Sequence, residues 1–475
     1  MPSTPRRLAD FPRSSPLCGV FFAAAVAIGW PAHALEIDGV QPAALDQPRI
    51  TVTLRASPQG EPIVAEAAAG GLAAQQSEML KDLLSDPALQ GMAGELKSQG
   101  IDLESMLAGG SGGGPGAFTA FLDTGASGMM ISGTQAAAMG LELATTSGGR
   151  EVTFVDVGVG GAVNFGVTNP LYVELTPHGK GTIGEHDAGP YRWKVKPGGG
   201  MLEAMVGPVN LVGMPAMMGR VMVIDASGLG DLQLLKTSLL PPRHPDIPRP
   251  SRDTLRVPLT YVDFEGFTEI IPRSADRPSF GPSPMIGPDP VADTPDEAEP
   301  MRLTHHGQEV AASWLVDTGA VASIVSEQHA NHLGVTLRPD GSGLDGPGTQ
   351  RQFTLPIGGV GGVKQVHGFF IERLVVPTQG GEPLVYRNAP ALVLDITITH
   401  PETGEVFTLD GVFGMNYLVG SALVSAGGGG MMGMPSIGDI RDTPFTYTVI
   451  DHPGEVMLLH PKDHGAAAAA PSSRR

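Results

Sequence analysis

The stretch AFLDTGASGMMIS (residues 120–132) places an aspartate directly behind an apolar run and follows it with Thr-Gly-Ala. The stretch SWLVDTGAVASIVS (residues 313–326) repeats this arrangement almost residue for residue. In both, the apolar run is typical of a buried strand, and burial at its end disfavours the ionised form of a carboxyl group. The glycine permits backbone angles that other residues avoid and lets a second segment approach closely. Asp123 and Asp317 are therefore the residues from which the fold and the chemistry are best inferred.

Three further pairs of segments follow the two aspartates in the same order. VDVGVGGAVNFGV (155–167) matches LPIGGVGGVKQVHGF (355–369), NLVGMPAMM (210–218) matches GVFGMNYLV (411–419), and VMVID (221–225) matches YTVID (447–451). The four elements also keep a similar spacing along the chain. An internal repeat of this kind indicates gene duplication, and it predicts two lobes related by a pseudo-two-fold axis.

The composition predicts a mostly β protein with many turns. The 475 residues include 66 glycines and 43 prolines, and only 17% are charged, which is typical of short strands and loose linkers. A chain of this length ordinarily makes two or three domains. We predict a first lobe over 35–238 with a helical insert at about 72–107, a proline-rich linker over 239–253, a second lobe over 254–462 with a disordered insert at about 272–300, and a disordered tail over 463–475.

The amino end has the features of a secretory signal peptide over residues 1–34. Three arginines and an apolar core at 17–30 precede AHA at 32–34, which fits a small-residue cleavage site. The core is too short to span a bilayer comfortably, and no other stretch approaches that length. We therefore expect an exported protein, periplasmic or secreted, with no membrane span in the mature chain. An uncleaved anchor is the alternative.

Cysteine content and charge exclude several classes of function. The single cysteine, Cys18, lies within the expected signal peptide, so the mature chain would have no disulfide, no cysteine-ligated zinc and no cysteine nucleophile. The formal net charge is −19 for the whole chain. Removal of the signal peptide makes the protein still more acidic. Such a charge argues against nucleic acid and anionic membranes as partners.

A duplicated chain that folds symmetrically would bring the two Asp-Thr-Gly turns together on the axis. Two carboxylates about 3 Å apart cannot both ionise, so they share a proton. The ionised carboxylate can take a proton from water while the protonated one polarises a carbonyl oxygen. The pair therefore predicts amide hydrolysis without a metal, a cofactor or a covalent intermediate. One such motif alone could be only a turn, because Asp-Thr-Gly is ordinary turn chemistry.

Two Asp-Thr-Gly loops in one chain resemble the bilobal aspartic peptidases of the pepsin type, and the details resemble the retropepsin-like branch more closely. Alanine follows the glycine in both loops, at Ala126 and Ala320, as in retropepsins. IGGVGGVKQV (357–366) is similar to the glycine-rich flap of retroviral proteases, and VGVGGAVN (157–164) is a weaker counterpart. VFGMNYL (412–418) is similar to the segment beneath the catalytic turn.

The resemblance covers roughly 115–225 and 301–451, and it implies two aspartic-peptidase β-barrel lobes with the active site between them. Carried over by position, it implies a catalytic dyad of Asp123 and Asp317, catalytic-loop support from Thr124, Gly125, Thr318 and Gly319, and substrate-binding flaps at Gly160, Gly161, Gly361 and Gly362. It also implies an aspartic endopeptidase that takes a peptide or protein substrate and needs no metal or cofactor. Because both halves of the site lie in one chain, we expect a monomer.

The chain departs from the family pattern in three respects. Pro215 stands where the matching element has Asn416. No tyrosine can be placed as a pepsin-like flap tyrosine, because Tyr172 follows the glycine-rich segment and Tyr191 lies in the unusual segment GPYRWKVKPGGG (189–200). The third departure is from the pepsin pattern alone: the alanine after each glycine replaces a serine or threonine whose hydroxyl would steady the carboxylate. We therefore predict a milder pH optimum than the strongly acid one of many pepsins.

Two other classes of function stay open. The chain could be a catalytically silent retropepsin-like protein that binds peptides or acts as a scaffold. It could also be a hydrolase that uses Ser111, because GGSGG (109–113) satisfies a serine-hydrolase pattern, although without the strand-to-helix context. His305-His306 before Gly307 predicts a hairpin turn rather than a metal site, because no partner ligands are suitably spaced.

Overall fold

About half of the described residues lie in β-strands, and the helices are few and short. The computed structural model describes residues 34–44, 46–64, 116–158, 161–177, 187–197, 209–228, 235–264, 278–292, 297–359, 362–380, 382–399, 406–420, 422–423 and 440–462. The signal peptide up to residue 33, the helical insert at 72–107 with Ser111 beyond it, and the tail at 463–475 were predicted from sequence and lie outside these ranges.

A nine-stranded sheet carries the first aspartate. Its strands, in order across the sheet, are β5 (Thr153–Gly158), β6 (Gly161–Val167), β9 (Lys194–Lys196), β4 (Met130–Ser132), β10 (Leu211–Val212), β3 (Ala117–Leu122), β2 (Arg49–Arg55), β7 (Leu171–Pro177) and β8 (Asp187–Tyr191). Buried and partly exposed positions alternate along β3, as the two-residue period of a strand requires. Its last residue, Leu122, is buried and leads directly into Asp123.

An eleven-stranded sheet carries the second aspartate. Its main path is β14 (Thr260–Val262), β15 (Ser283–Ile286), β18 (Trp314–Val316), β27 (Gly411–Phe413), β19 (Ile324–Val325), β24 (Leu384–Val393), β23 (Gly362–Val376), β16 (Met301–His305) and β17 (Gln308–Ala312). Two further strands join it: β1 (Leu35–Asp38) pairs with β24, and β22 (Phe353–Gly359) pairs with β23. All three residues of β18 are buried, as is typical of a strand covered on both faces.

The strands around the two aspartates are arranged in the same way. β3 runs parallel to β10, which is antiparallel to β4. Likewise β18 runs parallel to β27, which is antiparallel to β19. The backbone N–H of Asp123 donates to the Val212 carbonyl and that of Asp317 to the Phe413 carbonyl, both at 3.1 Å. In both copies the third element of the sequence repeat therefore pairs with the first in the same register.

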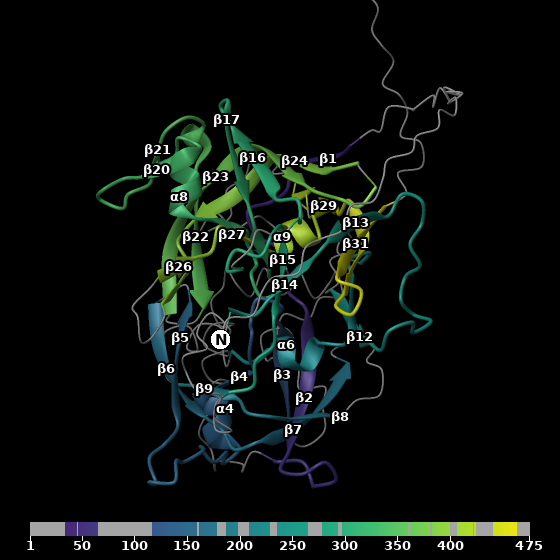
Figure 1. Ribbon diagram of the computed structural model, residues 1–475, viewed down its shortest axis with the longest axis vertical. Helices are drawn as coiled ribbons and strands as arrows, with labels where there is room; N and C mark the ends of the chain where they lie inside the picture. Colours follow the sequence, from purple (N-terminus) through teal and green to yellow (C-terminus); the bar gives the residue numbers. More distant parts are fainter. Residues whose placement is uncertain are drawn as a thin grey trace, which may run out of the picture. The chain divides into compact units, whose positions relative to one another are not determined.

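A five-stranded sheet joins the two copies of the repeat. Its order is β12 (Lys236–Leu240), β11 (Val221–Asp225), β30 (Phe445–Asp451), β31 (Val456–Pro461) and β13 (Leu255–Pro258). The fourth repeat element of each copy contributes a central strand, because β11 pairs antiparallel with β30. β31, near the end of the described chain, lies beside β13 (Figure 1).

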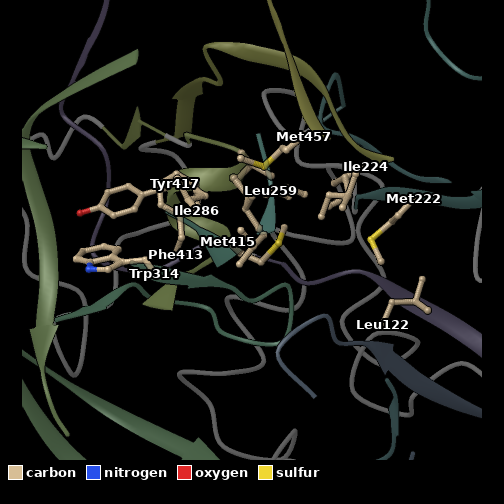
Figure 2. Close-up of a cluster of buried hydrophobic side chains, with 14 of the residues drawn as sticks. Leu122, Met222, Ile224, Leu259, Ile286, Trp314, Phe413, Met415, Tyr417 and Met457 are labelled. Atoms are coloured by element: carbon tan, nitrogen blue, oxygen red, sulfur yellow. The ribbon is translucent and has the colours of Figure 1, made fainter. Parts of the chain in front are cut away.

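One hydrophobic core extends across both copies. Figure 2 shows Leu122 and Met222 from the first copy in the same cluster as Trp314 and Tyr417 from the second. The chain from Ala34 onward is accordingly one compact unit. The predicted lobes at 35–238 and 254–462 are therefore not separate compact units, because a shared sheet and a shared core join them.

Two sequence predictions need correction. Neither large sheet closes into a barrel within the described ranges, since the strands at the two ends of each sheet do not pair with each other. The disordered insert predicted at 272–300 is wrong for its middle part, where β15 is buried at every position. Its apolar pair, Met285 and Ile286, aligns with Leu315 and Trp314 of β18. The proline content suggested disorder, but this apolar pair completes the sheet.

The remaining elements are short. They are α4 (Gly133–Ala138), α6 (Met214–Met217), α8 (Glu327–His332), α9 (Met415–Leu418), the 3-10 helix η2 (Thr349–Arg351), and the strand pairs β20 (Thr336–Leu337) with β21 (Leu344–Asp345), β25 (Thr397–Thr399) with β26 (Val406–Thr408), and β28 (Ala422–Leu423) with β29 (Ile440–Asp442). None of the helices in the described ranges has the length and apolar character needed to cross a bilayer. The hairpin turn predicted at His306-Gly307 is confirmed, because it joins β16 to β17 with positive φ at both residues.

Candidate active site

The two Asp-Thr-Gly loops interlock through their threonines. The backbone N–H of Thr124 donates to Thr318 Oγ1, and the backbone N–H of Thr318 donates to Thr124 Oγ1, both at 3.1 Å. Each hydroxyl in turn donates across the interface, from Thr124 to the Val316 carbonyl and from Thr318 to the Leu122 carbonyl, both at 2.6 Å. Both threonines are fully buried. Four reciprocal hydrogen bonds therefore fix the position of each loop relative to the other.

The glycine of each loop makes room for the aspartate of the other. A Cβ atom added to Gly125 would lie 2.4 Å from Cγ of Asp317, and one added to Gly319 would lie 2.3 Å from Cγ of Asp123. Real Cβ atoms do not approach other heavy atoms so closely, so the opposing aspartate would have to move its carboxyl group away from this position. The structure thus brings together the six predicted residues of the two loops, and it gives both glycines a steric role.

Both carboxyl groups are partly buried and rest on backbone N–H groups of their own loops. Asp123 Oδ1 accepts from the N–H of Ala126 at 3.0 Å. Asp317 Oδ1 accepts from Gly319 at 2.7 Å and from Ala320 at 3.0 Å. The two carboxyl groups also lie within hydrogen-bonding reach of each other. A proton between them would satisfy the second oxygen of each group.

The pKa of both carboxyl groups is displaced upward. Burial raises the pKa of Asp123, and its hydrogen bonds to Asp317 and to the loop backbone lower it in part. Burial, and next the negative charge of Asp123, raise the pKa of Asp317 well above its usual range. The pair therefore retains a proton at pH values where two isolated carboxyl groups would both be ionised.

The segments beneath the two loops differ. In the second copy, Ser323 Oγ donates to Asn416 Oδ1 at 2.7 Å and accepts from the N–H of Gly414 at 2.9 Å. The side-chain amide of Asn416 also donates to the Gln41 carbonyl at 3.2 Å. In the first copy, the carbonyl of Pro215 accepts from the Tyr191 hydroxyl at 3.1 Å instead. Tyr191 therefore supports the segment beneath the first loop.

An amino-terminal arm over residues 39–44 and 46–48 contacts the second loop, and sequence reasoning missed it. The side-chain amide of Gln47 donates to the Gly319 carbonyl, and the backbone N–H of Ala44 donates to the Val321 carbonyl at 2.8 Å. No motif marks these residues. Their role depends on a contact between segments more than 270 positions apart, which no local pattern in the sequence reports.

Both glycine-rich segments form β-hairpins. β5 pairs with β6 up to Gly158 and Gly161, and β22 pairs with β23 up to Gly359 and Gly362. Gly161 and Gly362 thus follow the turns directly, whereas Gly160 and Gly361 lie outside the described ranges.

Each hairpin can be traced to one aspartate loop. Ile357 of the second hairpin belongs to the same apolar cluster as Ala320 and Val321. For the first hairpin, the Phe154 ring lies 5.2 Å from the ring of Phe280, which bridges to Gly128 behind Asp123. The second hairpin therefore packs with its loop, and the first reaches its loop through Phe280.

One group in the described ranges has the spacing of metal ligands. Ligand atoms of His305, His306 and Glu372 all lie within 4.8 Å of one another. The Nε2 atom of His305 is already engaged with the Pro347 carbonyl at 2.9 Å, and Glu372 accepts from the backbone N–H of His306 at 2.8 Å. The group includes no residue of the two aspartate loops. These contacts explain the cluster as bracing of the β16–β17 hairpin.

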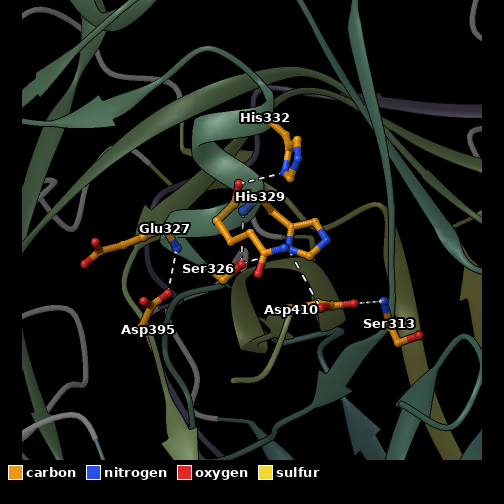
Figure 3. A network of polar contacts seen from close by, with 8 residues as sticks. Ser313, Ser326, Glu327, His329, His332, Asp395 and Asp410 are labelled. Carbon is orange, nitrogen blue, oxygen red and sulfur yellow. Dashed lines mark hydrogen bonds and ion pairs between the residues drawn. The ribbon is translucent and has the colours of Figure 1, made fainter. Parts of the chain in front are cut away.

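A second polar network has the composition of a hydrolase triad but not its geometry (Figure 3). Ser326 Oγ contacts Nδ1 of His329 at 2.8 Å, and Asp410 Oδ1 lies 3.8 Å from that same nitrogen. A triad requires the serine on one ring nitrogen and the carboxylate on the other. Ser326 also accepts from the backbone N–H of His329 as the N-cap of α8. The network therefore caps a helix.

Comparison with known proteins adds no relative to this picture. No protein family matches the chain, and no curated protein matches it. The arrangement of the two aspartates is therefore interpreted from its own geometry.

Proposed function

We propose that the chain is an aspartic-type endopeptidase, which hydrolyses peptide bonds with a water molecule activated between Asp123 and Asp317. One observation carries the proposal: reciprocal threonine bonds and two opposed glycines hold the carboxyl groups in contact, and the pKa of both is raised. A structural role alone does not require two acidic groups in contact. Like charges at this distance cost stability unless a proton is shared.

The proposed reaction needs only the shared proton and water. The ionised carboxylate accepts a proton as the water oxygen bonds to the carbonyl carbon, and the protonated carboxyl donates to the carbonyl oxygen. The resulting tetrahedral diol collapses when one hydroxyl returns its proton to a carboxylate and the amide nitrogen takes a proton from the other carboxyl group. The C–N bond breaks, releasing a carboxylic acid and an amine, and the pair regains its single proton.

The proposal also covers the arrangement of the two copies, the role of the two hairpins and the export of the protein. The two copies of the repeat would be pseudo-symmetric lobes with the active site between them. The hairpins β5–β6 and β22–β23 would then cover a bound peptide, as flaps do. The repeated strand arrangement around each aspartate and the contacts of each hairpin support this reading. Export fits the amino-terminal sequence, and a monomer fits the presence of both aspartate loops in one chain.

The test is cleavage of a denatured protein or peptide library from pH 3 to pH 7, with products read by mass spectrometry. Asp123→Asn and Asp317→Asn keep the shape of each side chain while removing its acid–base chemistry. We expect each to lower the rate by roughly a hundredfold to ten-thousandfold, the usual contribution of a general acid or base. A pepstatin-like inhibitor should also block cleavage. Tight peptide binding with no products would instead indicate a peptide-binding protein, and undiminished cleavage by both variants would refute the proposal.

A further inference from the structure

The two copies of the repeat differ at a position directly beside the aspartate loops. In the first copy, Lys194 of β9 aligns with Met130 of β4, and its backbone N–H donates to the Met129 carbonyl at 2.9 Å. In the second copy, Leu392 of β24 aligns with Ile324 of β19, and its backbone N–H donates to the Ser323 carbonyl, also at 2.9 Å. The two backbones thus match, and a lysine in one copy replaces a leucine in the other.

Both side chains lie next to the loops. Lys194 is 5% exposed, and a Cβ atom added to Gly128, in the segment behind Asp123, would lie 3.4 Å from its Cε. Leu392 is fully buried in the apolar cluster that also contains Ala320, which follows the second aspartate loop. The environment beside the first aspartate is therefore cationic, whereas the one beside the second is apolar.

Aromatic rings surround the ammonium group of Lys194. Its Nζ lies 5.8 Å from the ring centroid of Phe165, 5.9 Å from that of Phe154 and 6.0 Å from that of Phe280. Ring faces attract a cation and bring little water with them. A charge in such surroundings acts on its neighbours more strongly than it would in water.

Lys194 is the one cation that acts on either carboxyl group in the described part of the chain, and it acts on Asp123. Each carboxyl group accepts from two N–H groups of its own loop, Gly125 and Ala126 on one side and Gly319 and Ala320 on the other. In the described part of the chain, the charged groups that act on Asp123 are Asp317 and Lys194, and the one that acts on Asp317 is Asp123. Backbone N–H groups at matching positions act on both carboxyl groups, whereas among the described residues a lysine acts on Asp123 alone.

We propose that Lys194 is a positioning residue that makes Asp123 the ionised member of the pair and leaves the shared proton on Asp317. The proposal rests on the proposed function and deepens it. Asp123 would then take the proton from water, and Asp317 would polarise the substrate carbonyl. The sign of the effect follows: a nearby cation favours the ionised form, so removing it raises the pH at which the pair first loses a proton. The acid limb of the activity profile must then move to higher pH.

The test compares kcat/KM against pH for the exported form of the chain and three variants. Lys194→Met should move the acid limb upward by about half a unit to one unit, whereas Lys194→Arg, which keeps the charge, should restore it. Lys196→Met is the matched control. Lys196 is also buried on β9, two residues along, and its Nζ contacts the Gly359 carbonyl at 3.4 Å. That control should leave the acid limb in place, whatever it does to the rate.

A carboxyl ¹³C titration of aspartate-labelled protein needs no turnover, and Asp123→Asn and Asp317→Asn identify the two signals. In the unmodified protein, the Asp123 signal should titrate at lower pH than the Asp317 signal. The inference is overturned if Asp317 ionises first, if Lys194→Met leaves both signals unmoved, or if Lys196→Met moves them equally. A protein that cleaves nothing but titrates in the expected order would refute the peptidase proposal alone.

Discussion

The two aspartate loops have the same backbone but different supports. The threonine and the glycine of each loop contact the other loop in the same way. Each aspartate strand also pairs in the same register with the neighbouring strand of its own copy. Around this shared centre, Lys194 and Pro215 stand in the first copy where Leu392 and Asn416 stand in the second. The comparison teaches that symmetry is kept where atoms of the two loops touch. The two copies differ at the residues that pack around the loops, where such differences can give the two carboxyl groups different roles.

The sharpest way to break the symmetric centre is to add one methyl group on either side of it. Gly125→Ala and Gly319→Ala should each abolish peptide cleavage, because the new Cβ would lie within 2.4 Å of the opposing carboxyl carbon. A displacement of about 1 Å at reacting groups costs roughly a hundredfold in rate, and here both carboxyl groups must move. Rates are read with a fluorogenic peptide. The control is Gly148→Ala, where the nearest atom is 3.8 Å away. Appreciable activity in either loop variant would show that the carboxyl groups need not touch.

The threonines test whether the centre also holds the fold together. Thr124→Val keeps the volume of the side chain but leaves the buried N–H of Thr318 and the Val316 carbonyl without their partner. Each buried unsatisfied group costs about 1–3 kcal/mol, so we expect a loss of roughly 3–4 kcal/mol in the free energy of unfolding. Chemical denaturation measures it. Thr318→Val should cost a similar amount, because it removes the other two bonds, those of Thr318 Oγ1 with the Thr124 N–H and the Leu122 carbonyl.

The control for the threonines is Thr119→Val on β3, a partly buried strand position where valine is well tolerated. It should change the free energy of unfolding by less than about 0.5 kcal/mol. A loss in either the Thr124 or the Thr318 variant that is no larger than that of the control would contradict the reciprocal arrangement.

A buried histidine beside the sheet that joins the two copies leads to a prediction about how the stability of the protein depends on pH. The backbone N–H of His452, in the turn after β30, donates to the Arg220 carbonyl before β11, and its Nδ1 lies 2.7 Å from the Tyr261 hydroxyl. Burial lowers the pKa of His452 from about 6.5 to about 4. Between these values the unfolded chain binds more protons than the folded one, so stability falls as the pH drops through this window. The loss is at most about 3 kcal/mol.

Unfolding of His452→Asn, followed from pH 7 to pH 4, should show a shallower loss of stability than the unmodified protein. The comparison must be a difference between the two proteins, because the raised pKa values of the two aspartates act in the opposite direction, stabilising the fold at low pH. His332→Gln, at an exposed position on α8, is the control and should keep the original slope. Identical slopes for His452→Asn and the unmodified protein would show that this histidine does not titrate as inferred.

The sequence predicted the centre of the site because its chemistry is carried by short motifs that occur twice. Asp123 and Asp317 each end an apolar strand, and Thr124 and Thr318 follow at once, so the repeat alone suggested that the two turns meet. The lining of the centre was not predicted, because it comes from contacts between distant segments. Lys194 has no motif around it, and its meaning appears only when the pairing of β9 with β4 places it beside the loop.

The prediction of disorder at 272–300 failed for a similar reason. Composition averages over a segment, and prolines and charged residues dominate this one. The structure depends instead on Met285 and Ile286, which are fully buried because β18 offers an open edge for β15 to pair with. The shared core was not predicted, for the same reason. The repeat indicates two equivalent halves, but it does not show how much surface they bury against each other.

The prediction with the smallest expected effect compares the residues beneath the two loops, Asn416 and Pro215. Asn416→Ala should lower the free energy of unfolding by about 2 kcal/mol, because the buried Ser323 hydroxyl and the Gln41 carbonyl both lose a partner. Pro215→Ala in the first copy should change it by less than about 1 kcal/mol, because the Tyr191 hydroxyl bonds to the backbone carbonyl, which alanine keeps. Chemical denaturation of both variants gives the comparison. Equal losses would mean that the two loops are supported alike, so that the asymmetry around the pair is confined to Lys194. A larger loss at Asn416 would mean that the second loop depends on a side-chain bridge to the amino-terminal arm. The two copies of the repeat would then differ in how their loops are supported as well as in the charge beside them.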